Sequence, residues 1–167
     1  MRLLHAFCAL LFFINSACAE EFSIEEENLT AVPKAVANTI SAQKKFEFPE
    51  CSFKGKLAHI ADSDKPSDYI VTTARACGWG AAAGPIWIVA KINGSYKVVL
   101  QTTAYATEIR KDKDHGLHQL VTTSGTAGHA SYTRWAFTGK NYKPQENYVF
   151  LPDDEKLCNA HKDICPF

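Results

Sequence analysis

Residues 62–80 read DSDKPSDYIVTTARACGWG, and residues 112–130 read DKDHGLHQLVTTSGTAGHA. The second stretch repeats two acidic residues, an aliphatic-Val-Thr-Thr word and a glycine of the first at an offset of 50 residues. The offset shrinks to 48 between Trp87 and Trp135, and to 46 between the Tyr-Lys pairs at 96–97 and 142–143. A shrinking offset means that loops have lost residues while the short strand-like sequences have been kept. We therefore predict a β structure for the repeated unit, which spans residues 62–97 and 112–143.

Each copy predicts an acidic turn, a strand, a Gly-rich loop, a Trp-bearing strand, a tight turn and a last strand. The predicted strands are 69–73, 85–91 and 96–101 in the first copy, and 119–123, 132–138 and 142–143 in the second. Strands at 53–60 and 102–110 bring the total to roughly eight, with one more short strand at 148–151. Asn93-Gly94 is the strongest hairpin signal, because both central residues of a type I′ turn need positive φ.

A helical stripe precedes these strands. Val32, Val36 and Ile40 recur at the spacing of one helix face, with Thr30 as a candidate N-cap and Pro33 in the first turn. We expect an amphipathic helix of about three turns that ends near residue 44 or 45 and covers one face or edge of the sheet. The predicted fold is mainly β, a β-sandwich or a strongly bent antiparallel sheet from two related hairpin units, with this one N-terminal helix.

The first residues have the three parts of a secretory signal peptide. Arg2 is followed by an apolar run at 3–14 and by the small-x-small sequence Ala17-Cys18-Ala19. The alternative is a membrane anchor, but the apolar run is short for a bilayer span. We therefore predict a signal peptide at 1–19, an acidic leader outside the core at 20–29, and a single β-rich domain at 30–167, exported to the periplasm or the extracellular space.

Charge excludes some classes of partner. The whole chain has 18 basic and 18 acidic residues and a formal net charge of +0. It also lacks a basic cluster, so neither nucleic acid nor an anionic membrane surface is an expected partner. The expected partner is another protein or a component of the cell envelope, with no stable membrane insertion after removal of the signal.

Four cysteines remain after the signal: Cys51, Cys77, Cys158 and Cys165. An even number in an exported chain predicts two disulfides, with three possible connectivities. We favour Cys51–Cys77 and Cys158–Cys165, because each pair closes a short segment. A zinc site that includes His161 is the alternative, although no C-x-x-C pair is present.

The acidic turns, followed by Tyr-Ile-Val and Gln-Leu-Val, resemble the blade-opening pattern of FG-GAP and VCBS-type β-propeller repeats. The resemblance implies calcium binding through acidic loop residues, here Asp62, Asp64, Asp68, Asp112 and Asp114. Aspartates also cap turns through their own backbone, and we favour this role, because Pro66 and Gly116 stand where a third alternating acid belongs. We therefore expect no metal and no cofactor, and two copies are too few to close a propeller.

The Gly-rich loops at 77–85 and 124–130 are the candidate binding region. Small side chains let a partner approach the backbone closely, and each loop presents a large side chain one residue after an equivalent glycine. The candidate binding residues are Gly78, Trp79, Gly80, Ser124, Gly125, His129 and Tyr132. Alternatively, the glycines only permit close strand packing and Trp79 fills the core.

Three functions remain open. The favoured one is a non-enzymatic binding module. Ser124-Gly125 followed by Tyr132 is similar to the Ser-Gly-x-x-Tyr-like loop of small exported proteins that block lysozymes, which implies an inhibitor of a cell-wall hydrolase. The third is a hydrolase that uses Cys77 with a histidine, or Ser124 with His129 or His118. Nothing in the sequence orders such a catalytic set, so we predict no catalytic residues.

Overall fold

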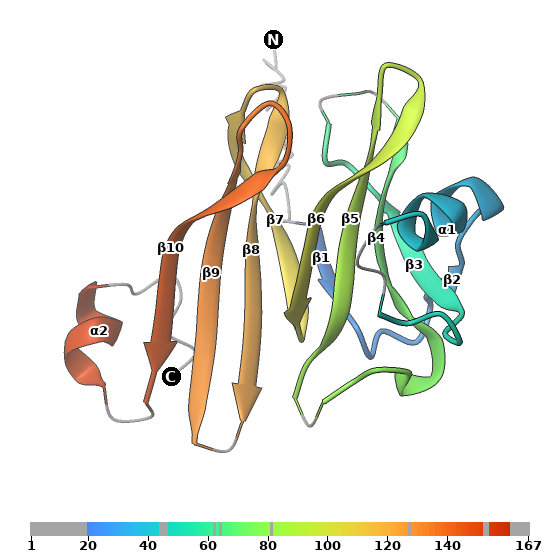
Figure 1. Ribbon diagram of the computed structural model, residues 1–167. Helices are drawn as coiled ribbons and strands as arrows, with labels where there is room; N and C mark the ends of the chain where they lie inside the picture. Colours follow the sequence, from blue (N-terminus) through green and yellow to red (C-terminus); the bar gives the residue numbers. More distant parts are fainter. Residues whose placement is uncertain are drawn as a thin grey trace, which may run out of the picture.

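The computed structural model describes residues 20–43, 47–61, 63, 65–80, 82–126, 128–151 and 154–160. The protein is mainly β, with two antiparallel sheets and few helices (Figure 1). In chain order the elements are β1 Glu20–Ser23, β2 Thr30–Ala31, α1 Lys34–Ser41, β3 Phe53–Ala58, β4 Asp68–Thr73, the 3-10 turn Ala74–Ala76, β5 Gly84–Ile92, β6 Ser95–Ala104, β7 Ala106–Asp114, β8 Leu117–Thr126, β9 His129–Phe137, β10 Tyr142–Phe150 and α2 Glu155–Ala160. The predicted signal peptide lies outside the described residues.

Each copy of the repeat builds one sheet. The first sheet has the order β2-β3-β4-β5-β6 and the second has the order β1-β7-β8-β9-β10, so we call them the repeat-1 sheet and the repeat-2 sheet. The inner faces share one hydrophobic core. Ile70, Ile86 and Ile88 enter it from the repeat-1 sheet, and Leu120, Phe137 and Tyr142 enter it from the repeat-2 sheet. Alternate residues of each strand therefore face the core, as the period of two requires.

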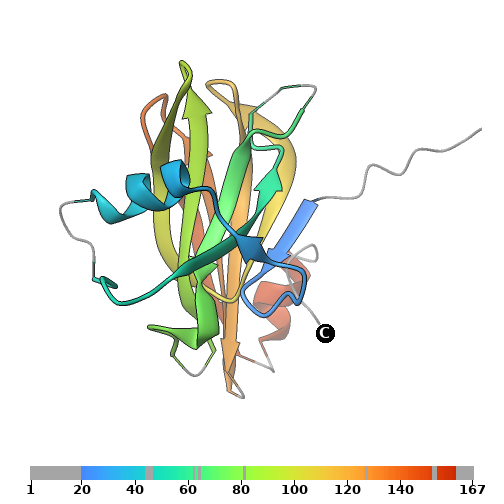
Figure 2. The same ribbon diagram turned by 90° about the vertical axis from the view of Figure 1, so that its right-hand side faces the viewer.

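The two helices lie on opposite sides of the pair of sheets (Figure 2). Val36 and Ile40 of α1 pack on a buried cluster of the repeat-1 sheet that contains Trp87. On the other side, Leu157 of α2 packs against the buried cluster that contains Tyr132. Within the described residues, no helix has the length and apolar character needed to cross a membrane.

Helix α1 contains part of the predicted stripe. It begins after Pro33, whose φ of −55° is close to the value that the proline ring imposes. Thr30, the expected N-cap, lies in β2 instead. The helix ends at Ser41 with Ala42 as its C-cap, so the expected end near residue 44 or 45 is wrong.

Two tight turns explain how the long hairpins close. Asn93 and Gly94 have φ of 51° and 78°, the left-handed values that the predicted turn between β5 and β6 requires. His115 and Gly116, at 47° and 84°, join β7 to β8 in the same way. The acidic stretch of the second copy is thus a hairpin end, whereas the first copy has a longer connection at 59–67. The connection before β4 and the turn before β8 therefore differ in length.

The acidic leader is not outside the core. Residues 20–23 form β1, which pairs with β7, and the buried side chains Phe22 and Ile24 are only 0% and 2% exposed. The prediction of a leader is therefore wrong for these residues. It fails because Glu20 and Glu21 dominate the composition, while two alternating apolar residues are enough to bury one face of a short strand.

Candidate functional site

The two Gly-rich segments meet at one end of the sheets, the lower end in Figures 1 and 2. Together they wall a cavity of about 390 Å³, which we call the end cavity. Its lining residues are Gly80, Ala82 and Ala83 before β5, Thr103 of β6, Ser124, Gly125 and Thr126 of β8, His129 and Ser131 of β9, and Val149 of β10. The cavity thus draws on both copies of the repeat, which belong to different sheets.

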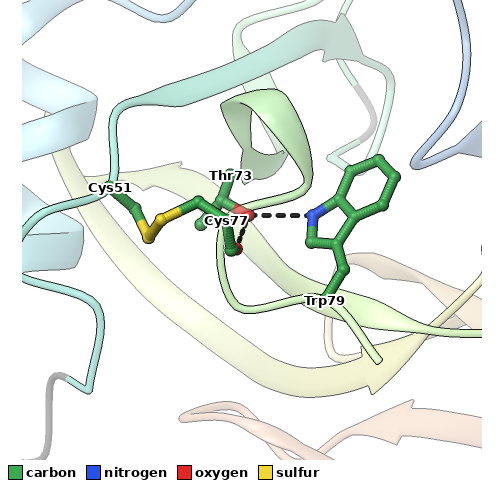
Figure 3. Close-up of a disulfide and its surroundings, with 4 residues drawn as sticks. All are labelled: Cys51, Thr73, Cys77 and Trp79. Atoms are coloured by element: carbon green, nitrogen blue, oxygen red, sulfur yellow. Dashed lines mark hydrogen bonds between the residues drawn. A yellow bond between two sulfur atoms is a disulfide. The ribbon is translucent and has the colours of Figure 1, made fainter. Parts of the chain in front are cut away.

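The first wall is held by a disulfide and a buried hydroxyl (Figure 3). The Cys51–Cys77 disulfide ties the segment before β3 to the end of the 3-10 turn, as predicted. Thr73 Oγ1 donates a hydrogen bond to the carbonyl oxygen of Cys77. The same hydroxyl accepts one from Trp79 Nε1 at 2.9 Å. These three links fix the start of the loop, so its tip is presented from a rigid base.

Trp79 turns inward from this loop. It packs against the core shared by the sheets, and the Lys54 ammonium lies 5.4 Å from its ring centroid. Gly84 lies directly beneath the indole, since a Cβ there would stand 2.8 Å from Trp79 Cδ1. Gly78 has φ of +74°, and a Cβ there would collide with the Phe48 ring. These two glycines are therefore explained by packing, while Gly80 lines the end cavity.

The second wall is a regular hairpin. Ser124 pairs with Ser131, Gly125 with Ala130, and Thr126 with His129 across β8 and β9. A Cβ added to Gly125 would have no neighbour closer than 3.9 Å, so packing does not demand a glycine at this position. The position borders both the end cavity and a second hollow on the other face of the sheet, and a Cβ at Gly125 would point toward Ala130 in that second hollow. This wall needs no cross-link, because strand pairing already defines it.

Apart from the His129 imidazole, the lining consists of small apolar and hydroxyl side chains. Four hydroxyl side chains, three from the hairpin and one from β6, accompany glycine, alanine and one valine. No carboxylate, lysine, arginine, tryptophan, tyrosine or phenylalanine of the described residues lines the cavity. His129 Nδ1 lies 3.3 Å from Thr126 Oγ1, so the imidazole is already engaged within its own hairpin. Such a lining suits an uncharged group that combines apolar parts with a few hydrogen-bonding atoms.

The structure brings together four of the seven candidate binding residues: Gly80, Ser124, Gly125 and His129. Gly78 and Trp79 do not line the cavity. They support the first wall through close packing, Gly78 against Phe48 and Trp79 against the shared core. Tyr132 is only 4% exposed, and it lines a second hollow of about 260 Å³ with Tyr105 and Phe150. Trp79 is not among the residues lining the end cavity, and its indole N–H is satisfied by Thr73.

Six lining residues were not among the candidates, and three of these, Ala82, Ala83 and Thr126, lie within the Gly-rich segments that were proposed as the binding region. Thr103, Ser131 and Val149 belong to strands, where their neighbours gave no sign of a cavity. The available signal was position: each stands near the strand end that faces the same end of the sheets as the Gly-rich loops. That signal can be used only when the pairing of the strands is known.

Of the five calcium candidates, two have hydrogen-bond partners in the fold, one is exposed, and two lie outside the described residues. The buried Asp68 carboxylate accepts the backbone N–H groups of Ala61 and Lys91, at 2.7 and 2.8 Å. Asp114 accepts a hydrogen bond from Gln119 Nε2 at 2.8 Å. Asp112 is exposed on β7, and Asp62 and Asp64 are not described. Asp68 and Asp114 thus act as hydrogen-bond acceptors for the fold.

The structure corrects two catalytic alternatives. Cys77 is disulfide-bonded, so it offers no thiolate nucleophile. His118 contacts the Arg110 carbonyl oxygen at 2.6 Å and lies six residues from Ser124 on the same strand, about 20 Å at 3.3 Å per residue. Cys158 is also disulfide-bonded, while its expected partner Cys165 and the zinc candidate His161 lie outside the described residues.

No protein-family model matches the chain, and no curated protein or solved structure is significantly similar to it. The end cavity and the strands around it therefore carry the functional conclusion.

Proposed function

We propose that the protein is an exported, disulfide-stabilised, non-enzymatic binding module of the β-sandwich type. The end cavity receives an uncharged projecting group of a partner, which is another protein or a component of the cell envelope. One observation carries the proposal: the Gly-rich loops of both repeats, from two different sheets, wall a single cavity. If the glycines of the two loops served only close strand packing, the loops would not be expected to line the same cavity.

Size and rigidity support binding. A volume of about 390 Å³ falls within the roughly 300–1,000 Å³ typical of ligand pockets. The disulfide and the Thr73 hydroxyl hold one wall, and the β8–β9 ladder holds the other. A wall that is already ordered loses little conformational entropy when a partner binds, which favours affinity.

The arrangement offers little for catalysis. A covalent mechanism needs a nucleophile within hydrogen-bond reach of a base that a third group orients. Ser124 is half-buried in the lining, but the hydrogen-bond partner of the His129 ring is Thr126. Among the described residues, the lining also lacks the pair of carboxylates that glycoside hydrolysis uses.

Export is supported by the cysteines. Disulfides persist in oxidising compartments, and Cys51–Cys77 is formed. This bridge lies next to the functional wall, so an oxidising environment is part of the proposed binding state.

The test compares two tryptophan substitutions. Immobilised residues 20–167 would be exposed to solubilised envelope proteins and to cell-wall fragments, and the retained species quantified by mass spectrometry. Ala83→Trp fills the end cavity, whereas Ala42→Trp adds the same side chain at an exposed site after α1. We expect about tenfold lower recovery with Ala83→Trp only, a loss of roughly 1.4 kcal/mol. Equal recovery by both variants and the wild type would reject the cavity as the site.

The inhibitor hypothesis is a narrower form of this proposal, in which the partner is a cell-wall hydrolase. It needs an exposed loop that enters the enzyme cleft, yet Tyr132 is buried and Ser124 and Gly125 line a hollow. Lysozyme activity in the presence of the protein, with residues 124–130 intact or deleted, decides this point. Inhibition by the intact protein and its loss on deletion would revive the inhibitor hypothesis.

A further inference from the structure

Strand β10 is a sheet edge with two unlike halves. It closes the repeat-2 sheet, and among the described residues no strand pairs with its free side. Its first half contains Pro144 and a register shift between Pro144 and Glu146. Prolines and bulges are devices that protect an edge from pairing with another chain. The second half, from Glu146 to Phe150, pairs regularly with β9 and has neither device.

The unprotected half is also apolar on its surface. Val149 is 58% exposed, and Leu151, just beyond the strand, is 53% exposed. Val149 lies in β10, and Leu151 follows the end of the strand two positions later. Val149 is part of the end cavity. An exposed apolar edge is therefore continuous with the proposed binding site.

Helix α2 lies on the other face of β10. Its residue Leu157 packs against the cluster of Tyr132 and Phe150, and Tyr148 packs against the same cluster. Tyr148 and Phe150 alternate with Val149, so their side chains point to the opposite face of the strand. The helix thus covers the face away from the end cavity and leaves Val149 exposed.

The other sheet edges are unlike β10. Strands β1 and β2 have only four and two residues. Strand β6, the remaining edge, is contacted by α1 and by β8 of the opposite sheet. A long, unprotected and partly apolar edge is a template for strand addition. Among the described strands, β10 alone combines these properties next to a cavity.

We infer that the partner contributes an extended polypeptide segment that adds to the second half of β10 as an additional strand. The inference rests on the proposed function, because one side chain of this segment enters the end cavity. In a sheet, every second residue of an edge strand directs its N–H and C=O to the free side, and the added segment satisfies these groups. The main chain supplies affinity, and the cavity selects the side chain.

The lining defines the chemistry of that segment. With no lysine, arginine or carboxylate in the cavity, a charged side chain would lose its hydration without gaining an ion pair. The inserted side chain is therefore uncharged, of the kind carried by alanine, valine, threonine or serine. A glycan is less suited, because sugar rings stack mainly on tryptophan, tyrosine and phenylalanine side chains, and none of the described residues lining the cavity is of these types.

The experiment selects ligands from a displayed library of random linear peptides on immobilised residues 20–167. Binding of the enriched peptides is then measured for the wild type, Val149→Lys and Leu57→Lys. Leu57 is a matched control, because it is 45% exposed on β3 and does not line the cavity. We expect uncharged extended peptides that bind Val149→Lys at least about tenfold more weakly and bind Leu57→Lys normally. Thermal unfolding of each variant shows that it is folded.

Amide hydrogen exchange supplies the second readout. Bound peptide should slow the exchange of alternate amides between residues 146 and 151, which a contact made only in the cavity would not do. Peptides that bind through Ala83 but leave these amides and Val149→Lys unaffected would overturn strand addition while the cavity proposal stands. A library without enriched peptides, together with cell-wall glycan fragments that lose binding in Ala83→Trp, would replace the peptide by a glycan. Peptides insensitive to both Val149→Lys and Ala83→Trp would overturn both proposals.

Discussion

The two Gly-rich segments face the same cavity but are constructed differently. The segment at 78–84 leaves its sheet and is held by a disulfide, by Thr73 and by the inward indole of Trp79. The segment at 124–131 continues the strands and is held by the ladder between β8 and β9. A duplicated unit has thus produced one stapled wall and one paired wall. The comparison shows that the strands of the repeat preserve the fold, while its loops have separated into different roles.

The tryptophans show the same divergence inside the strands. Trp87 and Trp135 correspond in the repeat, yet Trp87 pairs with Val71 and Trp135 pairs with Leu120. Leu120 matches Ile70, the residue before Val71, so the registers of the two copies differ by one residue. A shift of one residue moves a side chain to the other face of a sheet. Trp87 consequently lies beneath α1, while Trp135 packs on the shared core.

The largest expected change in stability distinguishes Trp87 from Trp135. Trp87→Ala should lower the free energy of unfolding by about 3–5 kcal/mol, because Trp87 is 0% exposed and makes edge contacts with Phe48 and Phe53. Trp135→Ala should cost less, roughly 1–3 kcal/mol, since Trp135 is half-buried. Urea unfolding of both variants measures the difference. Equal losses would contradict the assignment of the two side chains to opposite faces.

Removal of the Cys51–Cys77 disulfide should cause the next largest loss of stability. Cys51→Ser combined with Cys77→Ser should cost about 2–4 kcal/mol through the unfolded state. Hydrogen exchange should become faster at 74–84 and remain unchanged at 124–131, because only the first wall depends on the disulfide. Faster exchange in both segments would mean that the walls are not held independently.

Alanine substitutions at one glycine of each wall compare the packing of the two walls of the end cavity directly. Gly84→Ala should cost about 1–3 kcal/mol, because the added methyl group would overlap the Trp79 indole. Gly125→Ala should change stability by less than about 0.5 kcal/mol, since its Cβ would meet only ordinary contacts. Thermal unfolding of the two variants checks the contrast. The contrast between a wall packed tightly on Trp79 and a wall without such packing fails if Gly125→Ala is the more destabilising of the two.

The smallest effect depends on pH. Burial, followed by the charges of Asp68 and Asp114, raises the pKa of Tyr142 above the ordinary value of 10.0. The unfolded chain therefore releases this proton at lower pH than the folded chain, so the stability that Tyr142 contributes is complete below pH 10 and falls above it. Tyr142→Phe removes the hydrogen bond to the His118 carbonyl oxygen and should cost about 0.5–1.5 kcal/mol near neutral pH. Denaturant titrations at increasing pH should show this difference shrinking above about pH 10; a constant difference would contradict the buried hydroxyl.

The fold was largely predictable because local signals agreed with one another. The strand words at 69–73 and 119–123 became β4 and β8, the Asn93-Gly94 turn has the required φ values, and Cys51 bonds to Cys77. The missed strand β1 shows the limit of these signals. It has only four residues and depends on pairing with β7, a contact between distant parts of the chain.

The candidate site was predictable only in part. The sequence marked Gly80, Ser124, Gly125 and His129, because glycine-rich words interrupt the strand pattern. It could not assign Trp79, since the choice between rim and core is made by Thr73, a partner visible only after folding. It could not mark Val149, because exposure of a strand residue depends on which sheet lies opposite.

The most direct test of the shared cavity is amide hydrogen exchange of residues 20–167, free and saturated with the tightest peptide from the library. If both segments wall one site, bound peptide should slow exchange at 80–84 and at 124–131 together, with β10 amides slowed as well and the turn at Asn93-Gly94 unchanged. Protection of one Gly-rich segment without the other would contradict the claim that both repeats build a single binding site.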